Sequence, residues 1–332
     1  MYSRLRPLLF RADPENAHAG TLRLMQLVGS LPPLADLISR VYEVHSSPVK
    51  LFGLEFPNRV GLAAGYDKDG LAWRGLASLG FGHIEIGSVT PRPQPGNPKP
   101  RVFRLVEDNA IINRMGFPGR GAEFVAKRLT GNQPARLIIG VSLGINKTTK
   151  LEQAEEDYLP LMKIFSTLAD YLAINVSSPN TAGLRQLQMR SYLEGLLSKL
   201  KAQQSTPLLV KLSPDLSNQE LDEAVGVIVD SKLDGIIAAN TTLARPSLSS
   251  PRATETGGLS GHPLTAKSRE MVRRIYSLSG GKIPIIAVGG IMSGADAKAA
   301  LNAGASLVQV FTGLIYRGPG LVKEIIEATT AK

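Results

Sequence analysis

Residues 175–185, NVSSPNTAGLR, end an apolar run with a dense set of uncharged hydrogen-bonding side chains. Ser, Pro and Asn all favour turns, so the segment is compatible with ordinary turn chemistry. It is also compatible with a reaction site, in which Ser178 is the candidate acid–base group. Serine is a poor base in water and needs a desolvated site and a reaction that removes charge as it forms.

Other side chains narrow the chemistry that Ser178 could perform. The chain has no cysteine, which excludes disulfides, thiolate metal sites and a cysteine nucleophile. Its four histidines lack HExxH-type spacing, so we expect no zinc hydrolase and no metal site. A serine nucleophile would need a nearby base, and no histidine is obviously placed for one. Proton loss from carbon, coupled to hydride loss to a flavin, meets the needs of a serine base.

Two lysines and four asparagines are candidate ligand-binding groups. Lys211 interrupts the apolar strand LLVKLSPD, which is unfavourable unless it faces an anion or a carbonyl oxygen, or reaches the strand end. Lys68, in GYDKDG, is either a second anion-binding group or a solvated loop charge. Four carboxamides at one mouth would suit a flat, polar, uncharged ring such as a pyrimidine, although each alone is more typical of a turn. These four are Asn113, Asn175, Asn180 and Asn240.

Eight short apolar runs, each followed by polar or glycine residues, must position these groups. They are nearly continuous in hydrophobicity, as expected for parallel strands covered on both faces. Eight strand–helix units over about 270 residues favour a closed (β/α)₈ barrel, with an open doubly wound sheet as the alternative. The predicted strands are 59–65, 83–90, 136–144, 171–178, 207–214, 235–242, 283–290 and 306–313. The predicted helices between them include 151–169, 190–204, 217–232, 264–279 and 293–303.

The ends of the seventh and eighth predicted strands indicate a phosphate site. Gly289 and Gly290 precede a predicted helix, and Thr312 and Gly313 follow the eighth strand. Bare backbone amides beside a helix N-terminus bind phosphate, and barrels place such sites after strands seven and eight. Three long loops, 91–115, 179–190 and 243–262, lie on the same predicted face, which favours a functional role for them.

Residues 1–45 lie outside the eightfold pattern, and we expect a helical extension before a barrel domain at 46–332. Residues 34–42 carry apolar side chains at the spacing of one helix face, and residues 17–28 carry a thinner stripe. Residues 5–10 combine apolar side chains with flanking arginines and resemble a segment that seeks a membrane surface. Packing of these helices against the barrel is the simpler alternative.

Composition limits the class of protein and of partner. With 43% hydrophobic and 20% charged residues, the chain is typical of a globular protein. Its formal charge of +10 suggests an anionic partner or reflects general solubility. No apolar run approaches the ~18 residues of a membrane span. The N-terminus lacks the core of a signal peptide, so we expect the protein to stay inside the cell.

The ordered motifs of the chain resemble class 2 dihydroorotate dehydrogenases, the membrane-associated, quinone-reducing enzymes of pyrimidine biosynthesis. The blocks that carry the resemblance are GLAAGYDKDG, PRPQPGNPKPRVFRL, INRMGF, INVSSPNTAGLR, VKLSPDL, ANTT, TGGLSGHPL and VGGI. Class 1 relatives use a cysteine base and lack the N-terminal helices. This chain differs in both respects, because it contains no cysteine and its residues 1–45 are predicted to be helical. A flavin barrel acting on tRNA uridine is an alternative, but such enzymes use a cysteine acid. A peripheral membrane protein that merely binds phosphate ligands is a non-enzymatic alternative.

The resemblance implies an FMN-binding barrel that oxidises dihydroorotate to orotate, the fourth step of de novo pyrimidine biosynthesis. Ser178 would take the C5 proton while hydride passes from C6 to FMN. Implied substrate contacts are Lys68, Asn113, Arg114, Met115, Gly116, Phe117, Asn175, Asn180, Asn240 and Thr241. Implied FMN contacts are Ala64, Gly65, Tyr66, Asp67, Lys68, Ser88, Ser142, Asn175, Lys211, Ala239, Gly261, Gly290, Phe311 and Thr312.

The resemblance also implies a place for the protein in the cell. Residues 1–45 would form a quinone tunnel against a lipid surface, with His18 and Arg104 as lining residues. The protein would be peripheral on the cytoplasmic side of a bacterial inner membrane, and it would bind neither nucleic acid nor metal. The chain departs from the usual family residues at Ser142, Ala239 and Phe311, where Asn, Thr and Tyr are frequent.

Overall fold

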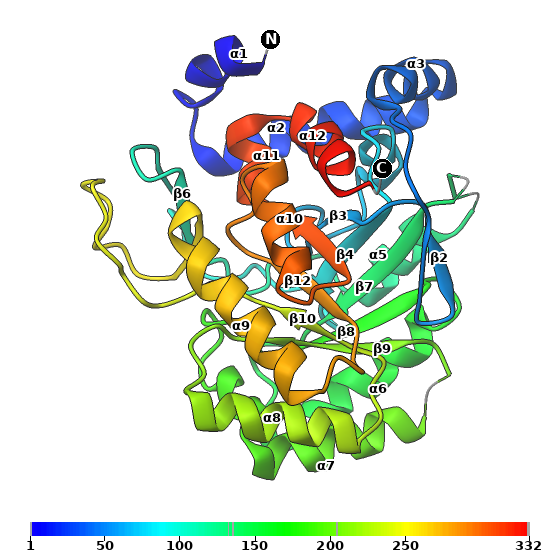
Figure 1. Cartoon of the computed structure of the whole chain (residues 1–332), viewed down its shortest axis with the longest axis vertical. Helices are drawn as coiled ribbons and strands as arrows, with labels where there is room; N and C mark the ends of the chain where they lie inside the picture. Colours follow the sequence, from blue (N-terminus) through cyan, green and yellow to red (C-terminus); the bar gives the residue numbers. More distant parts are fainter. Residues whose placement is uncertain (1, 132, 135, 204, 331–332) are drawn as a thin grey trace.

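The computed structural model describes residues 2–131, 133–134, 136–203 and 205–330, and its centre is a closed barrel of eight parallel strands (Figure 1). The strands follow the order β10-β12-β13-β3-β4-β7-β8-β9 around the barrel. Each strand falls inside one of the predicted apolar runs, so the predicted (β/α)₈ fold is confirmed. The strands are β3 (Val60–Leu62), β4 (His83–Val89), β7 (Ile138–Leu143), β8 (Tyr171–Asn175), β9 (Leu208–Leu212), β10 (Gly235–Ala238), β12 (Ile285–Val288) and β13 (Leu307–Val310).

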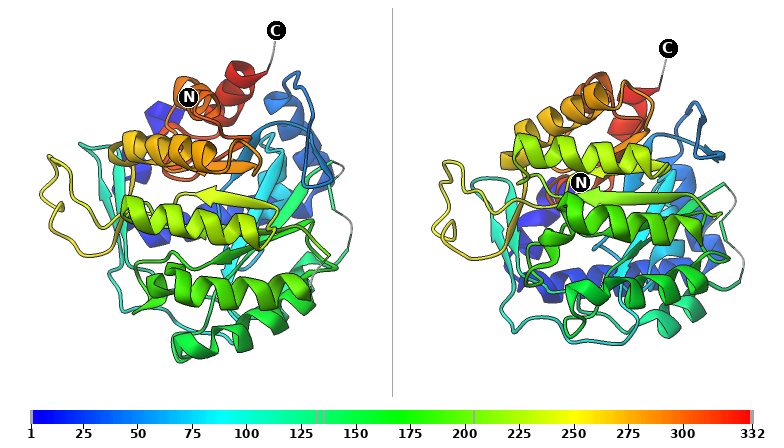
Figure 2. Two further views of the ribbon diagram at one scale, coloured as in Figure 1. Left: turned by 60° about the horizontal axis from the view of Figure 1, so that its bottom comes forward. Right: turned by 90° about the horizontal axis from the view of Figure 1, so that it is seen from below.

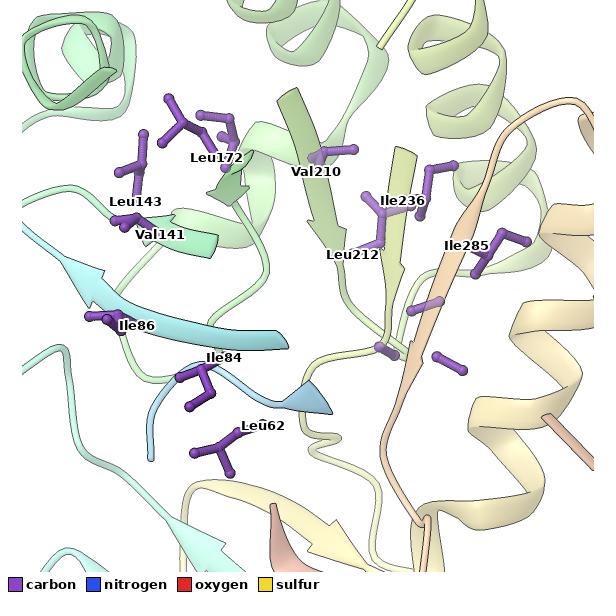
Figure 3. Packing of buried hydrophobic residues seen from close by; sticks show 14 of the residues in the cluster. Leu62, Ile84, Ile86, Val141, Leu143, Leu172, Val210, Leu212, Ile236 and Ile285 are labelled. Atoms are coloured by element: carbon purple, nitrogen blue, oxygen red, sulfur yellow. The ribbon is translucent and has the colours of Figure 1, made fainter. Parts of the chain in front are cut away.

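Alternation along the strands separates two sets of side chains, because successive residues of a strand point to opposite faces. One set, which includes Leu62, Ile84 and Val210, belongs to the large buried cluster between the strands and the helices (Figure 3). The other set, which includes Ala173, Leu209 and Ile286, forms a separate cluster inside the barrel. The continuous hydrophobicity of the strands follows from burial on both faces.

Helices surround the barrel where the sequence predicts them (Figure 2). Ser217 and Glu220 form a capping box that starts α8, and Ser293 caps the first turn of α10. Residue 204, the end of one predicted helix, lies outside the described residues. The helices of the barrel are α4 (Trp73–Ala77), α5 (Ala122–Leu129), α6 (Ala154–Phe165), α7 (Arg190–Ala202), α8 (Asn218–Asp230), α9 (Thr265–Leu278), α10 (Gly294–Asn302), α11 (Thr312–Arg317) and α12 (Gly320–Thr329).

Two of the predicted long loops are partly strand. β5 (Val102–Leu105) and β6 (Ala110–Asn113) form a hairpin, and β11 (Gly258–Gly261) pairs antiparallel with β6. The expectation of plain loops at 91–115 and 243–262 is therefore wrong. These strands are four residues each, and the pairing of β6 with β11 joins segments far apart in the chain, which local sequence does not reveal.

A short hairpin lies at the opposite end of the molecule from these loops (Figure 1). It consists of β1 (Val49–Leu51) and β2 (Leu54–Phe56). Phe56 is fully buried and packs with the cluster inside the barrel, so the hairpin covers the N-terminal end of the strands. The site must therefore be approached from the other end.

Three helices precede the barrel: α1 (Tyr2–Leu9), α2 (Pro14–Ser30) and α3 (Pro32–Tyr42). The helical extension expected for residues 1–45 is confirmed, while the domain boundary at 45/46 stays a prediction. Met25 and Val28 of α2 are buried and join the main core. Over the described residues, no helix combines the length and apolarity needed to cross a membrane.

Candidate active site

A single cavity of about 780 Å³ lies between the carboxyl ends of the barrel strands and the helices α1 and α2. It brings together most of the residues that the sequence singled out, although these come from every part of the chain. From the predicted set, the cavity is lined by His18, Ala64, Gly65, Tyr66, Lys68, Ser88, Arg104, Asn113, Met115, Gly116, Phe117, Asn175, Ser178, Asn180, Lys211, Ala239, Asn240, Thr241, Gly261, Gly290, Phe311 and Thr312.

Three predicted site residues do not line this cavity. Asp67 accepts hydrogen bonds from the backbone amides of Leu71 (2.8 Å) and Ala72 (2.7 Å), which shapes the turn before α4. Arg114 forms an ion pair with Glu255 at 2.7 Å. Ser142 is fully buried and its hydroxyl lies 2.7 Å from that of Ser88, which does line the cavity. Their side chains support the lining.

Ser178 is 6% exposed and lies just beyond β8. Its Oγ accepts a hydrogen bond of 3.3 Å from the backbone amide of Asn180. Within the described part of the chain, no basic side chain hydrogen-bonds to this oxygen. A conventional nucleophile–base pair is therefore absent from this region, and the desolvated hydroxyl suits proton removal from a bound carbon acid.

Carboxamide groups meet beside Ser178. Asn240 Nδ2 lies 3.3 Å from Asn175 Oδ1, and Asn175 Nδ2 donates to Ser88 Oγ at 2.8 Å. Asn180 Nδ2 donates to Asn113 Oδ1 at 3.2 Å, which joins the β8 loop to β6. The four asparagine side chains therefore cluster as the sequence led us to expect. They meet because the carboxyl ends of the barrel strands lie on one face.

The loop after β8 is anchored by Arg185 in a 3₁₀ helix, Leu184–Gln188. Its guanidinium forms an ion pair with Asp215 at 2.9 Å and donates to the carbonyl of Thr241 at 2.9 Å. Although burial opposes it, hydrogen bonds from Lys267 and Thr242 lower the pKa of Asp215 to about 2. The ion pair therefore persists across neutral pH and holds three site loops together.

Lys68 is a partly buried cation that lines the cavity. Its Nζ donates to the carbonyl of Gly65 at 2.5 Å. Burial lowers the pKa of Lys68 to about 8, with Asp69 and Glu15 opposing the shift. The ammonium is thus present at neutral pH and can bind an anionic group. Burial, reinforced by the charge of Lys68, lowers the pKa of His18 to about 4.

Lys211 points from β9 into the barrel end and is 5% exposed. Among the described residues its Nζ makes no hydrogen bond, and burial lowers its pKa. A buried cation that faces a cavity fits an anionic or electron-rich ring. The interpretation of this lysine as a ligand-facing group is consistent with its position.

The glycine turns after β12 and β13 line the same cavity at Gly289, Gly290, Thr312 and Gly313. Gly290 has φ +74°, and a Cβ there would lie 2.3 Å from the Cα of Thr265. Ser260 also lines the cavity, and its hydroxyl lies 2.8 Å from that of Thr312. Amides and hydroxyls of this kind fit a phosphate group. Together with Lys211, they give a donor set suited to FMN.

The other end of the cavity is apolar and comes from the N-terminal helices. Leu5, Leu9 and Leu24 line it, yet they remain 47%, 43% and 57% exposed. The cavity therefore reaches the surface beside exposed leucines. These lining residues were not individually predicted, although the apolar stripes of residues 1–45 indicated that some would exist.

Sequence reasoning also missed two polar side chains inside the barrel, Glu85 and Gln309. Both interrupt apolar strands, HIEIGSVT and SLVQVFTG, in the same way as Lys211. That signal could have found them.

In the described residues, no group of three or more His, Asp or Glu side chains could hold a metal ion.

Comparison with known proteins assigns the chain to a family. A family model described as dihydroorotate dehydrogenase matches residues 46–332. The chain is similar to the dihydroorotate dehydrogenase (quinone) of Acidithiobacillus ferrooxidans, with 49% identity over 98% of this chain and 93% of the relative. It is also similar to the dihydroorotate dehydrogenase (quinone) of Flavobacterium lutescens, with 47% identity over 99% of this chain and 96% of the relative.

Solved structures agree with this assignment. The crystal structure of DHODH from Eimeria tenella in complex with ferulenol superposes with a TM-score of 0.88 and 38% identity, covering 95% of this chain and 90% of that one. A ligand-free structure from the same organism gives a TM-score of 0.86 and 39% identity, over 95% and 94% of the two chains. The family model and the relatives each extend over most of the chain, and the chain therefore belongs to the dihydroorotate dehydrogenase family.

Proposed function

We propose that this protein oxidises (S)-dihydroorotate to orotate, with FMN as bound cofactor and a membrane quinone as electron acceptor. Family membership and the names of the relatives support the reaction and the acceptor. The observation that carries the proposal is one cavity that holds Ser178, the carboxamide cluster and Lys211 at one end and exposed leucines at the other. Such a cavity can serve a polar substrate and an apolar one.

The donor groups described above would hold FMN. Gly289, Gly290, Thr312 and Gly313 would bind its phosphate through amides and a hydroxyl, and Lys211 would lie beside its ring. FMN, when bound, supplies a hydride acceptor for the substrate and passes electrons on to the quinone. Ser142, Ala239 and Phe311 differ from the usual family residues, yet Ser142 still contributes indirectly by orienting Ser88.

The protein's own groups orient the substrate and move its proton. The carboxamides of Asn113, Asn175, Asn180 and Asn240 would pair with the amide and carbonyl groups of the ring, because each carboxamide offers both a donor and an acceptor. The Lys68 ammonium would bind the substrate carboxylate. Ser178 Oγ, which is almost fully buried, would then accept the proton from C5 as its own hydroxyl proton passes to a water molecule in the cavity.

The N-terminal helices would dock the protein on the cytoplasmic side of the inner membrane. Their exposed leucines support lipid contact, and the apolar end of the cavity opens beside them. His18 and Arg104, which line that cavity, would lie along the quinone path. No partner nucleic acid or metal is part of the proposal.

Anaerobic spectroscopy of the purified protein tests the proposed reaction. The protein should be yellow, and its flavin absorption should bleach on addition of dihydroorotate and return on addition of a quinone. Orotate is the matched control, because it should occupy the site without bleaching the flavin. A colourless protein that takes up no FMN, or a flavin spectrum that dihydroorotate leaves unchanged, would contradict the proposal.

A further inference from the structure

An ion pair joins the N-terminal helix α2 to the segment that precedes β5. The Arg101 guanidinium donates to both carboxylate oxygens of Glu15, from Nε at 3.2 Å and from Nη2 at 2.7 Å. Glu15 lies in the first turn of α2 and lines the cavity, whereas Arg101 comes 86 residues later and is only 7% exposed. A bidentate pair of this kind fixes both the distance and the orientation of the two segments.

The same guanidinium also shapes the segment 95–101. Its Nη1 donates to the carbonyls of Pro95 at 2.7 Å and Asn97 at 2.9 Å. Between these two residues Gly96 has φ +75°, and a Cβ there would lie 2.8 Å from Arg101 Nη1. The backbone therefore wraps closely around the guanidinium, and the positions of Arg101 and Asn97 are linked.

Asn97 extends this link to the substrate end of the cavity. Its Nδ2 donates to the carbonyls of Arg114 at 3.0 Å and Asn180 at 3.2 Å, and its backbone amide donates to the carbonyl of Met115 at 2.9 Å. Met115 and Asn180 both line the cavity. The backbone amide of Asn180 in turn donates to Ser178 Oγ. A continuous series of polar contacts thus runs from α2 to the candidate base.

We propose that Arg101 is a positioning residue for the substrate site, because its pair with Glu15 fixes that site relative to the N-terminal helices. Arg101 does not line the cavity, so it acts on a ligand only through its partners. Without Glu15, the nearly buried guanidinium would lose its counter-charge, and the penalty for burying an unpaired charge would displace the segment around it. The inference rests on the proposed function for the identity of the ligand. It adds a dependence of substrate binding on the helices at the apolar end of the cavity.

Orotate binding to the FMN-loaded enzyme tests the proposal in Glu15→Gln. Electrostatics alone predicts tighter binding of the orotate anion, because the substitution removes a negative charge from the cavity lining. Positioning predicts the opposite, and we expect the affinity for orotate to fall by about 5-fold or more. Isothermal titration calorimetry measures the change. Equal or tighter binding of orotate by Glu15→Gln would overturn the proposal.

Lys99→Gln is the matched control. Lys99 Nζ lies 3.4 Å from the same Glu15 carboxylate, but its side chain is 64% exposed. An exposed ion pair of this kind contributes little, so the affinity of Lys99→Gln for orotate should stay close to that of the wild type. A loss in Lys99→Gln as large as that in Glu15→Gln would contradict the specific role of Arg101.

Arg101→Lys covers the case in which Glu15→Gln fails to fold. Lysine keeps the positive charge but lacks the planar fork that makes the bidentate pair, so we expect a similar loss of orotate affinity. The double variant should bind orotate no more weakly than Arg101→Lys alone, because both changes break one contact. Wild-type affinity in Arg101→Lys, or additive losses in the double variant, would overturn the proposal. A wild type that binds no orotate would refute the proposed function, whereas orotate binding that these variants leave unchanged would refute only the role of Arg101.

Discussion

Ser177 and Ser178 are neighbours in sequence but differ in their hydrogen bonds. Ser177 Oγ is fully buried, lies 3.0 Å from Asn175 Oδ1 and accepts from Asn240 Nδ2 at 2.9 Å. It therefore holds two carboxamides in place. Ser178 Oγ accepts a hydrogen bond from the amide of Asn180, and Ser178 lines the cavity, where its hydroxyl can face a ligand. The sequence could not distinguish these roles without the resemblance.

Removal of the Ser178 hydroxyl should abolish fast proton transfer. In Ser178→Ala, we expect anaerobic flavin reduction by dihydroorotate to slow by about 10²–10⁴-fold, the usual contribution of a positioned base. Stopped-flow absorbance measures this rate. Orotate affinity should change little, which separates loss of the base from loss of the site. A reduction rate within a few-fold of wild type would remove Ser178 as the base.

Lys68 should make orotate binding depend on pH. Its pKa in the folded protein is about 8, below the ordinary value, so its charge is present below that pH and is lost as the pH rises through it. The affinity for anionic orotate should therefore fall above about pH 8. Titration of orotate into wild type, Lys68→Gln and Lys68→Arg measures this effect. The arginine variant should bind without the alkaline loss, and a flat wild-type profile would contradict the assignment.

At the scale of elements, α1 is held to the molecule by polar contacts rather than by burial. None of its described residues is buried. Tyr2 OH donates to the carbonyl of Ile315 at 2.5 Å, and Arg104 donates to the carbonyls of Leu9 (3.2 Å) and Ala12 at the end of the helix. The Arg104 guanidinium also lies 4.7 Å from the ring centroid of Phe10. Arg104 thus ties α1 to β5.

Loss of this tie should affect the quinone reaction selectively. In Arg104→Ala, we expect slower steady-state turnover with a long-chain quinone, by several-fold, because α1 loses the contacts that place its part of the cavity wall. Flavin reduction by dihydroorotate should remain close to wild type. Arg273→Ala is the control, since Arg273 is exposed on α9 and pairs only with Glu270 in the described contacts. Equal quinone turnover in the two variants would contradict this role.

At the scale of the whole molecule, apolar exposure is concentrated on the N-terminal helices. Leu8 of α1 and Leu37 of α3 are 64% and 60% exposed, and neither lines the cavity. Large apolar side chains on exposed faces mark interaction sites when they gather in one region. The apolar mouth of the cavity is lined by α1 and α2, so docking of the N-terminal helices on a lipid surface would bring that mouth to its quinone.

Charges placed on these helices should therefore weaken lipid binding. In Leu8→Glu combined with Leu37→Glu, we expect partitioning to liposomes to fall by at least ~100-fold, because each buried leucine contributes at least ~1.5 kcal/mol. Cosedimentation with vesicles measures the change. Val229→Glu is the control, because Val229 is an exposed apolar residue of α8 in the barrel. Equal vesicle binding by both proteins would contradict docking through these helices.

Periodic and local features of the sequence predicted the barrel correctly. Each strand is buried on both faces, so its sequence is continuously hydrophobic. Such a run can be recognised without knowing which strands lie beside it. The cap of α8 at Ser217 is likewise determined within a few residues. The pairing of β6 with β11 was not predictable in this way, because it depends on contacts between short segments far apart in the chain.

The sequence by itself therefore determined the fold class, the groups available for chemistry and the absence of a cysteine base. Tertiary structure decided which of those groups meet. It placed Ser178 and the carboxamides in one cavity and turned Asp67 and Arg114 away to support its walls. It also buried Glu85 within the same barrel interior as Lys211. The physical reason is that closure of parallel strands brings together residues that are distant in sequence, and burial then sets their charge.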